Sequence, residues 1–284
     1  MMERKRFEEL LNLVYFSRRE DGQKGDFGRL LLIGGSRQYP NALLLTGKGA
    51  ICAGVGYLSF HASEEVRSLT KRRAPLSAIY LDEVSIEAIA PYDAIVFGNG
   101  LEENEKNKEI LAFLLENLSP HQTLFLDATG IRLFRKSKKK HSCRLVLTPH
   151  LGEASFLLEE DGISRNPEDH LPKAVPFAKE NDLFLLLKGY RSLLITPQGE
   201  VLEGNQVPTP SLAKAGTGDV LAGFLGGLSA FLLKSGVLFE EVILLADELL
   251  HECFLEAEKT ESQGLLSILD FPRLLRKYLR KRHP

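Results

Sequence analysis

The stretch that decides the fold is SLAKAGTGDVLAG, residues 211–223. It places small residues and one carboxylate, Asp219, directly before an apolar helical pattern. Small residues let a ligand approach the backbone closely, and the following helix points its free N–H groups and positive dipole end at that ligand. We therefore expect Gly216, Thr217 and Gly218 to form an anion hole for a phosphoryl group, with Asp219 at its edge.

Two roles for Asp219 fit this position equally well. Aspartate is among the best N-cap residues and contributes about 1 kcal/mol there. An ionised carboxylate beside phosphates repels them, however, so a phosphate site would keep it only to take a proton from an attacking hydroxyl. The residues of this stretch leave the choice between helix cap and general base open.

Short apolar runs alternate with helical patterns along the rest of the chain. Continuous rather than alternating apolarity is typical of strands in a mostly parallel sheet that is covered on both faces. The pattern predicts strands at 30–33, 54–60, 78–81, 94–97, 123–126, 145–147 and 183–187. It predicts helices at 42–53, 105–118, 153–158, 171–179, 220–233 and 240–257, and amphipathic helices near both ends. The expected fold class is therefore α/β.

Composition favours a small-molecule ligand. The 284 residues, 44% of them hydrophobic, suffice for a large core, and we expect a single domain over residues 1–284. The formal charge of −2 gives no electrostatic reason to expect nucleic acid or a membrane as partner. Three dispersed cysteines, no signal peptide and no membrane-length apolar run predict a cytoplasmic protein. The basic runs 135–144 and 276–284 are interpreted as a solvated loop and a helix end.

Glycine-containing turns follow several of the predicted strands. They are IGGS at 33–36, FGNG at 97–100, DATG at 127–130, TPHLGE at 148–153 and LKGY at 187–190. In a parallel sheet these turns meet at the carboxyl edge, where open α/β folds bind their ligands. Neither the Walker pattern nor GxGxxG is satisfied. The turns predict one shared cleft, but neither a P-loop nor a dinucleotide-binding fingerprint.

Read in order, these motifs resemble the ribokinase-like superfamily, and within it the NAD(P)H-hydrate dehydratases, the carboxyl-terminal half of the bifunctional nicotinamide nucleotide repair proteins. The resemblance is carried by KGDFG at 24–28, VFGNGL at 96–101, LFLDATGIRLF at 124–134, VLTPHLGEASFLL at 146–158, LLLKGYRSLLITPQG at 185–199 and LAKAGTGDVLAG at 212–223. The chain departs from the family pattern at Asn41, Thr129, Leu151 and 207–211. The resemblance implies a three-layer α/β/α fold with a mostly parallel central sheet, and it favours the base over the cap.

The implied activity is that of a carbon–oxygen lyase. It would dehydrate the S-epimer of NADHX or NADPHX to NADH or NADPH after ADP, or ATP, phosphorylates the substrate hydroxyl; Mg²⁺ is expected, with ligands unassigned. The resemblance implies Asp219 as the catalytic base. It places substrate contacts at Ala42, Gly100, His150 and Asp219, and nucleotide contacts at Lys188, Gly189, Tyr190, Arg191, Ser192 and Gly218. It also implies a symmetric homo-oligomer such as a tetramer, and we expect no epimerase domain in this chain.

Some residues and functions keep a second interpretation. A lone histidine in a turn, such as His150, commonly completes local hydrogen bonds, although its place in TPHLGE favours a ligand contact. Lys48 is interpreted as an exposed helix lysine. Asp127 would bind either a metal or the amides of its turn, and we do not assign it as a ligand. The rival functions are a small-molecule kinase of the same superfamily and a non-catalytic nucleotide-binding relative.

Overall fold

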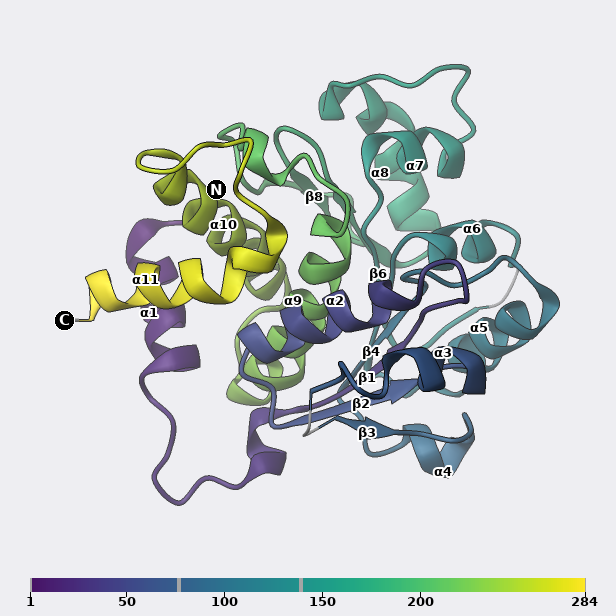
Figure 1. Ribbon diagram of the computed structural model, residues 1–284. Coiled ribbons are helices and arrows are strands. Elements are labelled where there is room, and N and C mark those ends of the chain that lie inside the picture. Colours follow the sequence, from purple (N-terminus) through teal and green to yellow (C-terminus); the bar gives the residue numbers. More distant parts are fainter. Residues whose placement is uncertain (1, 76–77, 138–139, 284) are drawn as a thin grey trace.

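The computed structural model describes residues 2–75, 78–137 and 140–283, and one nine-stranded sheet runs through them (Figure 1). The strand order is β3-β2-β1-β4-β5-β6-β7-β8-β9. Their bounds are β1 (Arg29–Ile33), β2 (Tyr57–His61), β3 (Ile79–Tyr80), β4 (Ala94–Phe97), β5 (Thr123–Leu126), β6 (Arg144–Leu147), β7 (Leu183–Leu187), β8 (Leu193–Ile195) and β9 (Val201–Glu203). All neighbours up to β7 are parallel, and β8 and β9 continue the sheet antiparallel. The mostly parallel sheet is as predicted.

Helices cover both faces of this sheet, which gives the expected α/β/α layers (Figure 1). Their bounds are α1 (Arg4–Tyr15), α2 (Pro40–Cys52), α3 (Glu64–Thr70), α4 (Ile86–Ile89), α5 (Glu105–Asn117), α6 (Thr129–Arg135), α7 (Leu151–Leu157), α8 (Leu171–Glu180), α9 (Thr217–Leu232), α10 (Phe239–Glu258) and α11 (Phe271–Arg282). Successive residues of a strand face opposite sides of the sheet. Leu30 and Leu32 of β1 lie in the core under α2, α9 and α10. Leu31 and Ile33 lie in the core on the other face, under α5 to α8. Two buried faces explain why the strands read as unbroken apolar runs.

Glycines bring α9 unusually close to α2. A Cβ on Gly49 would lie 1.9 Å from the Val220 carbonyl oxygen, and one on Gly223 would lie 1.8 Å from that of Thr46. Residues 217–235 are apolar and long enough to cross a membrane by composition, yet 72% of their most hydrophobic window is buried inside the fold. The glycines of AGFLGG therefore serve helix packing, and this packing fixes the amino end of α9 above the sheet.

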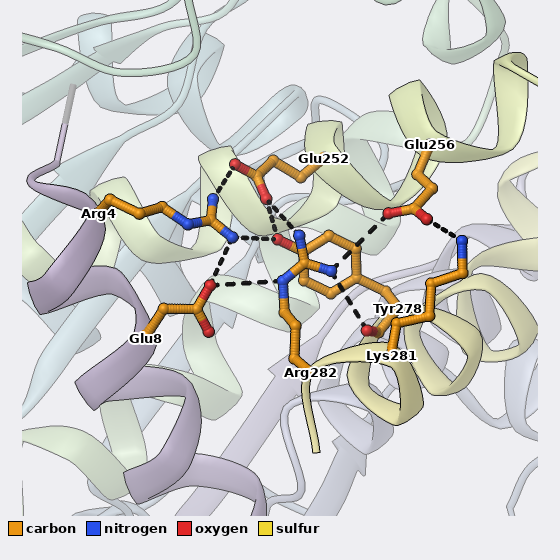
Figure 2. Close-up of polar contacts among 7 residues, drawn as sticks. All are labelled: Arg4, Glu8, Glu252, Glu256, Tyr278, Lys281 and Arg282. Carbon is orange, nitrogen blue, oxygen red and sulfur yellow. Dashed lines mark hydrogen bonds and ion pairs between the residues drawn. The ribbon is translucent and has the colours of Figure 1, made fainter. Parts of the chain in front are cut away.

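Charged side chains join the first helix to the last two. Figure 2 shows Arg4 between Glu8 and Glu252, with nitrogen-to-oxygen distances of 2.5 and 2.6 Å, and Arg282 reaching the same two carboxylates. Exposed ion pairs contribute little one by one, but this network links α1, α10 and α11. The basic run at the chain's end is thus part of a helix end, as predicted.

Short or irregular elements were missed by the pattern. The pattern omits β8, β9, α3, α4 and α6, which are three to seven residues long. It also begins β2 too early: Gly54 has φ of +75° and the Gly56 amide donates to the Phe27 carbonyl, so a turn precedes the strand. In the basic run 135–144, Arg135 ends α6 and pairs with Glu159, while residues 138–139 lie outside the described residues.

Candidate active site

Asp219 lies in the first turn of α9, close to the carboxyl edge of the sheet. The helix is capped by Gly216 in the left-handed conformation, with φ of 90°, and Asp219 makes no capping hydrogen bond. Its Oδ1 instead accepts a hydrogen bond of 2.9 Å from Nδ2 of Asn99, which follows β4. The helix-cap interpretation of Asp219 is therefore wrong, because a glycine occupies the cap and leaves the carboxylate free to face the sheet.

Asn99 connects two carboxylates. Its Nδ2 also donates to Oδ2 of Asp127, which follows β5, at 2.8 Å. Asn99 and Asp127 are both almost completely buried. One amide group thus uses its two hydrogens to hold Asp127 and Asp219 near each other. The sequence interpretation named Gly100 in the FGNG turn but missed its neighbour Asn99; the polar residue directly at a strand end was the available signal.

Asp127 is neutralised by a lysine rather than by the amides of its turn. Its Oδ1 accepts from Nζ of Lys188 at 2.6 Å and from Oγ1 of Thr148 at 2.8 Å. The turn-amide interpretation of Asp127 is thus wrong, since a buried carboxylate is stabilised best by a paired cation with further hydrogen bonds. A Cβ built on Gly218 would lie only 3.4 Å from the Lys188 ammonium. The lysine therefore places a positive charge beside the amino end of α9.

The environment perturbs two pKa values at this site. Burial raises the pKa of Asp219 to about 6, the hydrogen bond from Asn99 opposes that rise, and the nearby charge of Asp127 adds to it. Burial alone would lower the pKa of Lys188, but the charges of Asp127, Glu153 and Asp219 outweigh it, so this pKa is raised. At neutral pH the site holds an ammonium ion and a carboxylate whose proton affinity suits general-base catalysis.

The predicted anion hole is only partly free. The Thr217 amide donates to the Lys214 carbonyl over a long 3.4 Å, so its prediction as a free donor is corrected. The amides of Gly218 and Asp219 have no acceptor in the part of the chain that the structure describes. Oγ1 of Thr217 is buried and likewise has no partner among those residues. The free donors and the Lys188 ammonium together favour an anionic group at this helix end.

A cavity of about 460 Å³ opens beside these groups. Its lining combines the loop after β7, the loop before α9 and one face of α10: His150, Lys188, Gly189, Tyr190, Ser192, Pro208, Thr209, Pro210, Leu212, Ala213, Thr217, Gly218, Leu221, Asp247, Leu250 and His251. This volume is typical of small-molecule sites. Arg191 is the predicted nucleotide contact outside this lining; its guanidinium bonds to Asn166 and Glu168 instead.

The predicted substrate contacts fall into two groups. Ala42 and Gly100 touch, since a Cβ on Gly100 would lie 2.6 Å from that of Ala42, and both lie outside the lining of the cavity. His150 lines the cavity and also caps α7, its Nδ1 accepting from the Glu153 amide at 3.2 Å. The local hydrogen bond expected of His150 is confirmed, and its contact with the ligand stays a prediction. Asn99 precedes Gly100 and bonds to Asp219, so one hydrogen bond links the Ala42–Gly100 contact to the predicted base.

The placement predicted for Lys48 is confirmed in part. Lys48 lies on α2, as expected, but is half-buried rather than fully exposed. Within residues 2–75, 78–137 and 140–283, no three side chains of His, Cys, Asp or Glu gather in a way that could hold a metal ion. Asp127 and Asp219 are the carboxylates that bond to Asn99 beside the anion hole.

Comparison with known proteins agrees with this geometry. The family model described as NAD(P)H-hydrate dehydratase matches residues 30–251. The ADP-dependent (S)-NAD(P)H-hydrate dehydratase of Listeria monocytogenes is 30% identical over 220 residues, which are 75% of each chain. The ADP/ATP-dependent NAD(P)H-hydrate dehydratase of Bacillus subtilis, co-crystallised with ATP and Mg²⁺, superposes with a TM-score of 0.75 at 26% identity, over 97% of this chain and 96% of that one.

The ribokinase-like fold is confirmed by a further structure. A ribokinase-like superfamily protein of Enterococcus faecalis superposes with a TM-score of 0.78 at 25% identity, over 96% of this chain and 94% of that one. The family match spans the strands that carry the site and ends at His251 on α10. The chain therefore belongs to the NAD(P)H-hydrate dehydratase family.

Proposed function

We propose that this protein dehydrates the S-epimers of NADHX and NADPHX to NADH and NADPH, with ADP as the phosphoryl donor. The observation that carries the proposal is the network Asp219–Asn99–Asp127–Lys188 at the amino end of α9, beside a nucleotide-sized cavity. The named relatives act on these hydrates with ADP or with ADP and ATP. A base, a cation and free amides at one point are what phosphoryl transfer to a hydroxyl requires.

In the proposed reaction Asp219 removes the proton from the hydroxyl on the hydrated nicotinamide ring. The hydroxyl oxygen forms a bond to the terminal phosphorus of ADP, and the bond from that phosphorus to the bridging oxygen breaks, releasing AMP. The carbon–oxygen bond of the phosphorylated ring then breaks, phosphate leaves with the electron pair, and a ring proton is lost as the double bond forms. The sum is hydrate plus ADP giving reduced cofactor, AMP, phosphate and one proton.

The residues support these steps by position and charge. Gly218 and Asp219 offer their amides, and Lys188 its ammonium, to the oxygens of the transferred group. Asn99 keeps Asp219 oriented while leaving its second carboxylate oxygen free of hydrogen bonds within the described residues. Phosphate is a far better leaving group than hydroxide, so kinase-type residues are suited to driving a dehydration.

Mg²⁺ fits this site as a partner of the nucleotide. The available carboxylates, Asp127 and Asp219, already bond to Lys188 and Asn99. Mg²⁺ commonly binds one or two carboxylates together with substrate phosphates and waters, so Asp127 and the nucleotide phosphates would hold it, which leaves Asp219 free to accept the proton. When bound, it would neutralise charge on the phosphates.

One incubation tests the function against its kinase rival. Purified protein is mixed with NADHX and Mg²⁺, with ADP or ATP in parallel, and the absorbance of reduced nicotinamide is followed while AMP and phosphate are quantified. We expect NADH and phosphate to appear together, faster with ADP. A phosphorylated product that accumulates without NADH would favour a small-molecule kinase. Folded protein that binds neither substrate nor nucleotide would contradict the proposal.

The assembly, compartment and domain organisation are proposed with the activity. Large apolar side chains, Ile51, Leu265 and Leu269, are exposed near the groove between α2 and the turn before α11, and this supports a homo-oligomer, which we propose is a tetramer. We place the protein in the cytoplasm and treat residues 1–284 as one dehydratase domain. Light scattering in solution tests the assembly; a monomer at micromolar concentration would contradict it.

A further inference from the structure

A second polar cluster lies in the cavity, on the face of α10. Asp247 and His251 are one helical turn apart and both line the cavity. Asp247 is 1% exposed and holds the two loops around it: Oδ1 accepts from Oγ of Ser192 at 3.0 Å, and Oδ2 from the Asn205 amide at 2.8 Å. No lysine or arginine pairs with this carboxylate in the described parts of the chain. A buried carboxylate oxygen accepts more than one hydrogen bond, so Asp247 can take another donor.

The hydrogen bonds around His251 determine its tautomer. Its Nδ1 lies 3.0 Å from Nδ2 of Asn205, which can only donate, and 2.8 Å from Oγ1 of Thr209, whose hydroxyl can donate as well. The orientation of that amide is fixed because Nδ2 also donates to the Val207 carbonyl at 2.8 Å while Oδ1 accepts from the Val207 amide. Nδ1 of His251 must therefore accept, and the proton resides on Nε2. Burial lowers the pKa of His251, so the ring is neutral at pH 7.

Among the residues that the structure describes, no hydrogen bond is recorded for Nε2 of His251. Oδ1 of Asp247 lies 3.8 Å from it, which is beyond hydrogen-bonding distance. The cavity therefore presents one fixed donor next to one charged acceptor. A matching ligand carries an acceptor and a donor side by side. The amino edge of adenine does, because its exocyclic amine donates and the adjacent ring nitrogen accepts.

We propose that Asp247 and His251 recognise the adenine base of the nucleotide. Oδ1 of Asp247 accepts a hydrogen bond from the exocyclic amine, and Nε2–H of His251 donates to the neighbouring ring nitrogen. This inference rests on the proposed function, which brings the phosphates of the same nucleotide to Lys188 and Gly218. It assigns base specificity to two residues on α10, the α-helix that follows α9.

The pair discriminates against bases without that amine. In guanine a carbonyl oxygen replaces the amine and would face the Asp247 carboxylate, acceptor against acceptor. In purine riboside the position carries only hydrogen, which leaves Asp247 without its extra donor. Leaving one buried polar group unpaired costs about 1–3 kcal/mol, which corresponds to a loss of affinity of roughly 10- to 100-fold.

Ligand variation tests the proposal without altering the protein. Calorimetric titration of the wild-type chain in Mg²⁺ compares ADP, GDP and the diphosphate of purine riboside. We expect ADP to bind about 10- to 100-fold more tightly than either analogue. Equal affinities for the three nucleotides would overturn the proposal. NADHX turnover with ADP is measured on the same preparation: equal affinities with normal turnover contradict base recognition alone, whereas no ADP binding and no turnover contradict the proposed function as well.

Two variants test whether Asp247 and His251 are the residues that recognise the base. Asp247→Asn should lower the preference for ADP over GDP by roughly tenfold, because an amide donates to the guanine carbonyl. His251→Phe should weaken ADP binding by about tenfold while keeping a ring of similar size in the cavity. The matched control His121→Phe changes an exposed histidine far along the chain and should leave all affinities unchanged. Unaltered nucleotide preference in folded Asp247→Asn and His251→Phe would remove these residues from recognition.

Discussion

Replacing Asp219 with asparagine should stabilise the protein while abolishing most of its activity. Burial raises the pKa of this carboxyl from its ordinary value of 3.8 to about 6. Each unit of difference in pKa corresponds to about 1.4 kcal/mol, so ionised Asp219 lowers the free energy of unfolding by about 3 kcal/mol. Asparagine is neutral and its Oδ1 still accepts from Asn99. Turnover should nevertheless fall by roughly 10²–10⁴, because the positioned base is lost.

The pH dependence of this stabilisation has a definite sign. Above pH 6 Asp219 is ionised in both the folded and the unfolded chain, and the full destabilisation is present. As pH falls from 6 towards 4 the folded state takes up the proton first. The free energy of unfolding of the wild type therefore rises towards that of the variant. Below the unfolded value of 3.8 the carboxyl is protonated in both states and the difference vanishes.

Thermal and denaturant unfolding of both proteins between pH 4 and 8 measure this difference. A chain of this size should unfold roughly 5 °C higher in the Asp219→Asn variant at pH 8. The control is Asp161→Asn, which neutralises an exposed aspartate and should change neither stability nor turnover. A variant that is less stable than wild type at pH 8, or a stability difference that grows as pH falls, would refute the reasoning.

Three further substitutions examine the rest of the network. Asn99→Ala removes a hydrogen bond that lowers the pKa of Asp219, so the acidic limb of kcat/KM against pH should move to higher pH; an unmoved limb would contradict the bond's role. Lys188→Met should destabilise the fold by about 3–5 kcal/mol by leaving Asp127 buried and unpaired, and adding Asp127→Asn should recover much of that loss in denaturant unfolding. Gly218→Ala places a methyl group 3.4 Å from the Lys188 ammonium, so calorimetry should show weaker ADP binding at unchanged thermal stability; unchanged affinity would exclude this end of the helix as the phosphate site.

The strands of the sheet interior were predictable because both of their faces are buried. β4 and β7 are apolar throughout, and β1 and β5 are apolar after their first residue; such short runs between turns are typical of buried strands. The edge was not predictable in the same way. β9 alternates exposed and half-buried residues over only three positions, and its partner β8 adjoins a turn through Gly199. The pairing of β8 with β9 depends on contacts between residues in the folded chain, which the hydrophobic pattern of three residues does not predict.

The candidate site combines a motif that is local in sequence with partners that meet it only in the folded chain. The motif around Gly218 and Asp219 predicts an anion site, but by itself it leaves open whether Asp219 caps the helix or acts as a base. The partners of Asp127 could not be deduced locally: Asn99 and Lys188 are 28 and 61 residues away in sequence and meet it only through the strand order. The pair Asp247 and His251 was missed for a related reason, since both lie within an apolar helix that the pattern assigns to the core.

The central claim, that the hydroxyl leaves as phosphate, is tested most directly by labelling its oxygen. NADHX carrying heavy oxygen in the ring hydroxyl is converted with ADP, and the released phosphate and water are analysed by mass spectrometry. The proposed reaction forms the new phosphorus–oxygen bond with the hydroxyl oxygen and later breaks the carbon–oxygen bond, so the label should appear in phosphate. Label recovered in water, with unlabelled phosphate, would show that hydroxide leaves directly and would contradict the account.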